Sequence, residues 1–432
     1  MMIGCGGVGR TLLEMWKLEK QTISLLIIIE PRDIPEWCFK MYPNIQHIQK
    51  ALSKNNLKKI LLPILRKEKP FVVDVSVDVD AIKIMELCKM EKCNYINTSV
   101  EGWEEKNPQI LNPDPKALIK RSLFERENQA EKAIGNSKTT MLTNQGANPG
   151  LISQLVMKGL NDYVEKKGDK HSKKLLKNKE FNKLAHYLGL EEIHISEIDT
   201  QKSLKQRPKG YFFNTWSCIG FQAEALDPVQ IGNGSNRKGD DDGATIVGNM
   251  RIYPIRGMDI TCSSKCVGLD GETIDIQGML IPHAEADSLS DYLTDNEYRP
   301  SVFYVYQCGK DAIESLNEVR KNGYNPVHID KCYVLENKDI EAGGYDSLGA
   351  LLIFKNNCIW WCGSVLSIEE ARRLGFKHTA PTTIQVAISM INAINYISRN
   401  KKEGFIEPED LDWKMMIEQS KKYLGKIFSK EL

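Results

Sequence analysis

The chain has 432 residues, and its 58 lysine and arginine residues nearly balance its 57 aspartate and glutamate residues, which gives a formal net charge of +1 at pH 7. This balance excludes the strong positive field that would draw a protein to nucleic acid or to an anionic membrane. Its hydrophobic content of 41% and charged content of 27% are typical of a globular protein. No apolar run approaches the ~20 residues that span a bilayer. The length predicts two or three domains.

The 11 cysteines are scattered along the chain, without the spacing of a disulfide framework. Cys262 with Cys266 and Cys358 with Cys362 share an offset, but both pairs lack nearby histidines, which favours buried thiols over a metal site. No secretory signal is visible at the start of the chain. We therefore predict a cytoplasmic protein with no metal, no membrane anchor and no nucleic-acid partner.

The chain opens with a glycine motif, in which Gly4, Gly6 and Gly9 form a G-x-G-x-x-G ahead of an apolar-periodic helix. In a dinucleotide fold such glycines make the turn, admit a diphosphate and pack helix against strand. An apolar run over 25–29 then ends in Glu30, where a carboxylate can bind both ribose hydroxyls. We predict NAD rather than NADP, although Arg32 could receive a 2′-phosphate. Only three residues precede Gly4, so either the first strand is a stub or the chain start has lost residues.

Strand-like and helical patterns alternate through the first third of the chain, which predicts βαβ units and a parallel sheet. Expected strands lie at 45–48, 71–77, 94–97 and 139–142, and 112–136 is typical of one long charged helix. Shorter strands follow from about Ile193, which predicts a second α+β domain with a mostly antiparallel sheet. The apolar helix at 382–398 should pack back on the first domain. We predict a Rossmann domain at 1–148, an α+β substrate domain at 149–378 and a C-terminal helical return at 379–432.

The second region places carboxylates and aromatic rings among apolar strands. Glu197 ends one such strand, Trp216 and Glu224 lie eight residues apart, and His283 follows an apolar run. Buried carboxylates repel each other unless a cation compensates them, and an indole face also attracts cations. Such a set suits a polycationic ligand. The ordinary alternative is exposed glutamates at strand ends and a core tryptophan.

These residues resemble the bacterial homospermidine synthase family, which is close to the saccharopine dehydrogenase-like group. The resemblance covers nearly the whole chain in order, including the spacing of Glu197, Trp216, Glu224 and His283. Two positions differ from the family pattern: Asn97 stands where an aspartate is usual, and Gly102 where a proline is usual. The matching segments are 76–78, 100–103, 146–150, 197–201, 214–217, 346–349 and 363–370, with Glu224 and His283 between them.

The resemblance implies an NAD that stays bound and is regenerated in each turnover. One putrescine gives hydride to NAD and becomes an imine, ammonia leaves as a second amine attacks, and returned hydride yields sym-homospermidine. Spermidine is an alternative aminobutyl donor in some members. A homodimer is implied as well.

The resemblance also implies a role for each site residue. Trp216 would hold the cationic intermediate by its ring face, Asn148 would orient the reacting nitrogen, and His283 would transfer protons with a pKa near the working pH. Asp346 would lie at the substrate entrance. The diamine path would be lined by Asp78, Glu101, Glu197 and Glu224. The cofactor would be bound by Gly4, Gly6, Gly7, Val8, Gly9, Glu30, Ser76, Thr98 and Asn148.

Two other functions stay open. The first is a saccharopine- or carboxynorspermidine-type oxidoreductase that releases NAD(P)H. It requires cationic residues for an α-carboxylate, whereas the residues singled out here are acidic. The second is a non-catalytic protein that senses NAD or polyamine, which the short first strand and Asn97 favour and the acidic set with Trp216 opposes.

Overall fold

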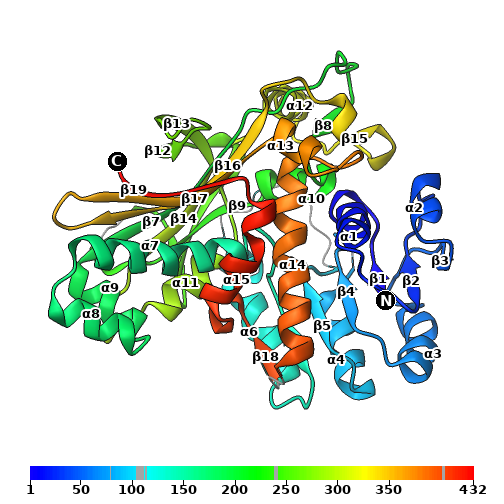
Figure 1. The fold of residues 1–432 in the computed structure, drawn as a ribbon, viewed down its shortest axis with the longest axis horizontal. Helices are drawn as coiled ribbons and strands as arrows, with labels where there is room; N and C mark the ends of the chain where they lie inside the picture. The colour runs from blue at the N-terminus through cyan, green and yellow to red at the C-terminus, as the bar shows by residue number, and fades with distance from the viewer. Residues whose placement is uncertain (78, 104–110, 112–113, 238–241, 401–403) are drawn as a thin grey trace.

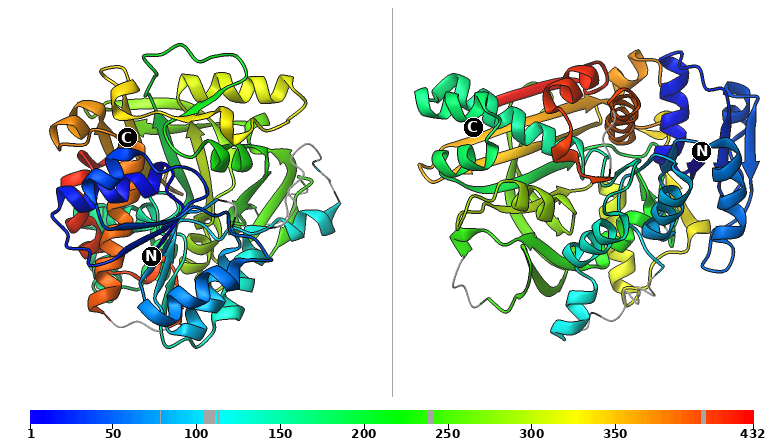
Figure 2. Two further views of the ribbon diagram at one scale, coloured as in Figure 1. Left: turned by 90° about the vertical axis from the view of Figure 1, so that its right-hand side faces the viewer. Right: turned by 90° about the horizontal axis from the view of Figure 1, so that it is seen from below.

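The computed structural model describes residues 1–77, 79–103, 111, 114–237, 242–400 and 404–432. It contains two seven-stranded sheets with helices between and around them (Figures 1 and 2). The first sheet has the order β18-β6-β5-β4-β1-β2-β3, and every pairing in it is parallel. Its strands are β1 (Met2–Ile3), β2 (Leu26–Ile29), β3 (Ile45–Ile48), β4 (Val72–Asp74), β5 (Tyr95–Asn97), β6 (Thr140–Leu142) and β18 (Gly404–Ile406).

This strand order is that of the doubly wound nucleotide fold, with β18 added beyond β6, so the predicted fold class is confirmed. Its switch point lies between β1 and β4, where ligands bind in open α/β sheets. The helices of this domain are α1 (Gly7–Leu18), α2 (Glu36–Met41), α3 (Leu57–Glu68), α4 (Ala81–Glu91), α5 (Pro115–Lys120) and α6 (Leu123–Ile134).

The first strand is indeed only two residues long. Met2 pairs with Ile28 on one side and Val73 on the other, and it is completely buried. The amino group of Met1 also donates a 2.8 Å hydrogen bond to the carbonyl oxygen of Phe71. A central strand this short is therefore held by pairing on both edges.

The prediction of a single long helix at 112–136 is wrong within the described residues. The chain breaks at Arg121 and Ser122 into α5 and α6. Ser122 has extended backbone, and its hydroxyl oxygen accepts a 3.0 Å hydrogen bond from the amide of Glu125, which caps α6. Serine favours such a cap over a helix interior because its side chain competes for backbone hydrogen bonds. This break matters because α6 then turns toward the site.

The second sheet has the order β12-β13-β14-β7-β16-β17-β19 and is antiparallel except for the parallel pair β14 and β7. Two small sheets, β10-β11-β9 and β15-β8, lie beside it. The strands are β7 (Leu190–Asp199), β8 (Phe212–Asn214), β9 (Pro228–Gly232), β10 (Thr245–Val247), β11 (Met250–Arg256), β12 (Thr261–Val267), β13 (Thr273–Ile281), β14 (Ser301–Gln307), β15 (Cys332–Val334), β16 (Tyr345–Phe354), β17 (Ile359–Ser367) and β19 (Lys426–Glu431).

The helices after β6 surround this second sheet. They are α7 (Leu151–Lys167), α8 (Lys170–Lys177), α9 (Phe181–Leu188), α10 (Cys218–Leu226), α11 (Glu285–Tyr292), α12 (Lys310–Lys321), α13 (Ile368–Arg373), α14 (Pro381–Arg399) and α15 (Trp413–Ser420). The lysines of the basic stretch at 166–177 are exposed, as a solvated helical excursion requires. None of the helices within the described ranges is long and apolar enough to cross a membrane.

Helix α14 joins the two halves of the molecule, standing between the first domain and the second sheet (Figure 1). The Thr11 hydroxyl on α1 donates a 2.9 Å hydrogen bond to the hydroxyl of Thr383 on α14. Buried Glu14 of α1 accepts a 2.7 Å bond from the amide of Lys377 and a 2.9 Å bond from the Thr379 hydroxyl. After α14, β18 pairs with β6 of the first sheet and β19 pairs with β17 of the second. The C-terminal segment therefore contributes to both sheets.

Candidate functional site

One cavity of about 420 Å³ lies where the strand ends of the first sheet face the second domain. Its walls include the glycine turn, the ends of β2, β4 and β5, the start of α6, the start of α10 and the turn before α11. Twelve of the sequence-predicted site residues line it: Gly4, Gly6, Gly7, Val8, Glu30, Ser76, Thr98, Glu101, Asn148, Trp216, Glu224 and His283. Gly9, Glu197 and Asp346 do not line it, and Asp78 lies outside the described residues.

Each of the three glycines of the motif has its own physical role in the turn. Gly4 has a φ of +89°, and a Cβ there would come within 2.8 Å of the Val75 carbonyl oxygen. A Cβ on Gly9 would come within 2.9 Å of the Gly4 carbonyl oxygen, so Gly9 serves packing rather than ligand contact. A Cβ on Gly6 would meet nothing within 4 Å. Gly6 precedes α1 without a side-chain cap, so the helix N-terminus is suited to a diphosphate.

The Glu30 carboxylate is fixed at the other end of this nucleotide cradle. One oxygen accepts a 2.8 Å hydrogen bond from the amide of Cys5, and the other accepts bonds of 3.1 and 2.9 Å from the amide and Nε of Arg32. Burial would raise the pKa of Glu30, but the bonds from Arg32 and Cys5 outweigh it and lower this pKa. An ionised carboxylate at this position suits ribose hydroxyls, and it engages Nε of the Arg32 guanidinium.

Ser76 and Thr98 lie on the wall between the cradle and the second domain. The Ser76 hydroxyl donates a 2.6 Å bond to Asp74, whose other oxygen accepts a 2.7 Å bond from the Tyr95 hydroxyl. Tyr95 in turn accepts a 3.1 Å bond from the amide nitrogen of Asn97. Burial raises the pKa of Asp74 to about 6. An aspartate at 97 could not donate to Tyr95 in its ionised form, so Asn97 is accommodated by this hydrogen-bond chain.

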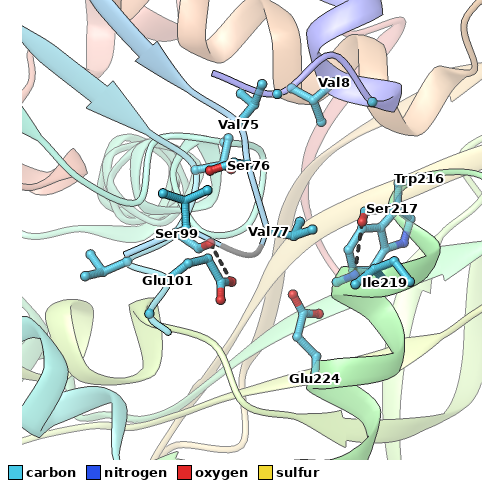
Figure 3. Close-up of a pocket in the computed structure, with 18 of the residues that line it drawn as sticks. Val8, Val75, Ser76, Val77, Ser99, Glu101, Trp216, Ser217, Ile219 and Glu224 are labelled. Carbon is cyan, nitrogen blue, oxygen red and sulfur yellow. Dashed lines mark hydrogen bonds between the residues drawn. The ribbon is translucent and has the colours of Figure 1, made fainter. Parts of the chain in front are cut away.

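The second domain supplies an aromatic and acidic wall. Trp216, just before α10, is half-buried, and its Nε1 donates a 3.3 Å bond to the Tyr306 hydroxyl. Figure 3 shows Glu224 from α10 and Glu101 from the first domain pointing into the same space, with Trp216 beside them. The Ser99 hydroxyl donates a 3.0 Å bond to Glu101. Two carboxylates and an indole face thus meet across the domain boundary.

His283 lies between two carboxylates, with Nε2 at 3.2 Å from Glu224 and Nδ1 at 3.3 Å from Glu285. Burial would lower its pKa, but the two carboxylates overcome this and raise the pKa of His283 to about 10. The expected pKa near the working pH is therefore wrong, because the imidazole is held as a cation at neutral pH. His283 bridges the two carboxylates, and its role in proton transfer stays a prediction.

Asn148 and Glu197 form a unit at the back of the cavity. The Asn148 amide donates a 2.8 Å hydrogen bond to Glu197, which accepts a second 2.8 Å bond from the Tyr304 hydroxyl. Burial raises the pKa of Glu197 to about 7. Glu197 is 2% exposed and does not reach the cavity. Within this structure it positions Asn148 instead of lining a diamine path.

Asp346 is completely buried on β16, opposite Asp199 in the register of β16 with β7. Burial, with the nearby Glu197 and Asp199 carboxyls, raises the pKa of Asp346 well above its usual range. The expected place at a substrate entrance is therefore wrong. Asp346 belongs to a set of buried carboxyls with Glu197 and Asp199, and these two neighbours oppose its ionisation.

Sequence reasoning missed three side chains at the site, because no local sequence pattern marks them as part of it. Glu285 contacts His283, and Glu127 and Arg126 of α6 line the cavity. Burial raises the pKa of Glu127 to about 7. Arg126 packs so closely that a Cβ on Gly102 would lie 1.8 Å from its Nη2, so a side chain at this position would displace the guanidinium. Among the described residues no group of His, Cys, Asp or Glu could hold a metal ion.

Both halves of the chain match models of known protein families. Residues 1–142 match the saccharopine dehydrogenase NADP binding domain, and residues 146–427 match the saccharopine dehydrogenase C-terminal domain. Homospermidine synthase of Blastochloris viridis is 30% identical over an alignment of 446 residues that covers 99% of this chain and 90% of that protein. Homospermidine synthase of Mesorhizobium japonicum is also 30% identical, over 99% of this chain and 89% of that protein.

Solved structures agree with this assignment. Homospermidine synthase of Legionella pneumophila, in complex with NAD, superposes with a TM-score of 0.85 at 27% identity, over 100% of this chain and 90% of that one. Saccharopine dehydrogenase of Saccharomyces cerevisiae superposes with a TM-score of 0.54 at 11% identity, which shows a shared fold. The chain belongs to the homospermidine synthase family.

Proposed function

We propose that this chain is an NAD-dependent homospermidine synthase that joins two putrescine molecules and releases ammonia, with spermidine as a further aminobutyl donor. The observation that carries this proposal is one cavity with two kinds of wall. One wall is a dinucleotide cradle of Gly4, Gly6 and Glu30, and the other is the acidic and aromatic set of Trp216, Glu224 and Glu101. A hydride carrier and a cationic amine would therefore meet in the same space.

The cradle fits NAD. The open space at Gly6 admits a diphosphate, the start of α1 supplies unpaired N–H groups, and ionised Glu30 suits the adenosine ribose. NAD, when bound, would accept hydride from the amine-bearing carbon and later return it. The side chains of the cavity would bind the amine, orient it and exclude water.

The acidic wall would hold the charged ends of a diamine. Glu101 and Glu224 would pair with ammonium groups, and Trp216 would present its ring to a cationic nitrogen, a contact of about 1–2 kcal/mol when desolvated. His283 lies between Glu224 and Glu285 and offsets part of their negative charge. The amide oxygen of Asn148 would accept a hydrogen bond from the reacting amine, since its Nδ2 is committed to Glu197. Asp78, from the same acidic set, lies outside the described residues and stays part of the proposal.

A saccharopine-type oxidoreductase is the second candidate function. Arg126 favours it, because this arginine lines the cavity and its buried Nη2 has no hydrogen-bond partner among the described residues. An arginine of this kind could receive an α-carboxylate. Arg121, also on the wall, is instead paired with Asp227. The carboxylates and indole at the opposite wall suit amines, so we prefer the synthase.

The deciding experiment incubates the purified protein with putrescine and a substoichiometric amount of NAD, with products separated by mass spectrometry. Homospermidine and ammonia without net NADH would support the proposal. NADH that accumulates with an oxidised substrate would favour the oxidoreductase. NAD binding without any product would favour a non-catalytic sensor. The homodimer, the cytoplasmic location and the domain limits at 148 and 378 stay predictions.

A further inference from the structure

Two cysteines face each other on the cavity wall. Cys218 begins α10 and Cys332 begins β15. Gln222 Nε2 lies 3.1 Å from the Cys218 carbonyl oxygen and 3.8 Å from the Cys332 sulfur, and each thiol shifts the pKa of the other. The Cys218 sulfur lies 3.5 Å from the carbonyl oxygens of both Phe212 and Tyr333. Phe212 is the residue paired with Cys332 between β8 and β15. The Cys218 sulfur is therefore held against this strand pair at the level of Cys332.

The two thiols differ in reactivity. Cys332 is half-buried, and the neighbouring Cys218 thiol, together with Gln222 and the charge of Arg32, lowers its pKa. Cys218 is 2% exposed, and burial raises its pKa well above the usual range. A thiolate is the form that attacks oxidants, so Cys332 is the nucleophile of the pair and Cys218 is the resolving thiol. Both residues line the cavity, from which a small solute reaches them.

We propose that Cys218 and Cys332 form a reversible disulfide when a peroxide enters the cavity. The Cys332 thiolate attacks one peroxide oxygen, which leaves a sulfenic acid at Cys332 and releases the other oxygen as water. The Cys218 thiol then attacks the sulfenic sulfur, which forms the S–S bond and releases a second water. Two thiols are oxidised and one hydrogen peroxide is reduced, so no further reactant is needed.

This disulfide would tie the first residue of α10 to β15. Trp216 and Ser217 come directly before Cys218, and Val334 on β15 also lines the cavity. The bond would thus fix two parts of the cavity wall to each other. The inference rests on the thiols and their surroundings and not on the reaction proposed above.

The test treats the full-length purified protein with hydrogen peroxide, alkylates the remaining thiols and maps peptides by mass spectrometry. We expect a cross-linked peptide containing Cys218 and Cys332, lighter by two hydrogens and restored by dithiothreitol. Cys218→Ser should lose the cross-link and leave Cys332 as a sulfenic acid that dimedone captures. Cys332→Ser should lose both products.

Other cysteines of the same chain serve as controls. Cys358→Ser is the matched control, because that half-buried thiol contacts Lys167 and Glu431 instead of a cysteine, and the cross-link should persist. The Cys5 thiol raises the pKa of Cys38, and these two cysteines are only 1% and 0% exposed, so they should oxidise more slowly. The proposal is overturned if Cys218 and Cys332 stay separately alkylated at a peroxide dose that oxidises Cys358. Oxidation of the Cys5 and Cys38 pair first would also overturn it.

Discussion

His283 Nε2 lies 3.2 Å from the carboxylate of Glu224, while its other nitrogen lies 3.3 Å from Glu285. The imidazole and the Glu285 side chain are 7% and 1% exposed, whereas Glu224 is 29% exposed, so the bridge runs from a buried carboxylate to one at the cavity. The bridge links α10, which carries Glu224, to the turn before α11. It therefore determines the charge of the acidic wall as well as its geometry.

His283→Gln should destabilise the protein by about 3–5 kcal/mol at about pH 6, because it leaves two carboxylates without their buried cation. The pKa of His283 is raised from 6.5 to about 10, so its stabilisation is fully present below 6.5 and is lost as the pH rises toward 10. Denaturant unfolding of both proteins across this range measures the difference in free energy of unfolding. A difference that did not change with pH would contradict the charged bridge.

Glu30→Gln should weaken NAD binding about tenfold, since hydrogen bonds to a charged group contribute about 1.5–3 kcal/mol. It should also reduce the preference for NAD over NADP, because the Arg32 guanidinium loses its anionic partner. Isothermal titration with both dinucleotides measures the two affinities. Glu36→Gln, at an exposed glutamate that pairs with Lys40 on α2, is the matched control and should leave both affinities unchanged. Equal loss in both variants would argue against a ribose contact.

Trp216→Ala should lower homospermidine formation about tenfold or more, because a desolvated cation–π contact of about 1–2 kcal/mol is removed. The rate of Trp216→Phe should lie between those of the unmodified protein and Trp216→Ala, because phenylalanine keeps an aromatic face but loses the bond from Nε1 to Tyr306. Product mass spectrometry gives turnover, and a thermal shift with NAD checks the cradle. If Ala and Phe variants turned over equally, the ring face would have no role.

Glu197 should produce an acid limb in the pH profile of kcat/KM. Its pKa is raised to about 7 by burial, so the carboxylate that accepts the Asn148 amide is present above that value and is lost as pH falls through it. Activity should therefore rise with pH through this range. Glu197→Gln should remove the limb, whereas Glu191→Gln, on the same strand outside the cavity, should retain it. A limb that persisted in Glu197→Gln would assign it to another group.

The sequence alone determined the nucleotide half of this protein. Turn and strand signals act over short distances, so the positions of Gly4, Gly6, Gly9 and Glu30 predicted a dinucleotide cradle before any packing was known. The alternation of strands and helices predicted the parallel sheet for the same reason. The break between α5 and α6 was missed, because Ser122 caps a helix inside a stretch whose periodicity continues across it.

The division of the acidic residues between cavity and core depends on contacts that arise on folding. Glu101 and Glu224 face the cavity from different domains, whereas Glu197 and Asp346 are buried behind Asn148. Exposure and charge state depend on neighbours that are distant in sequence, and a pKa follows the local dielectric and nearby charges rather than residue type. For this reason the pattern could list His283 but not its pKa of about 10, which arises from two carboxylates brought together by folding.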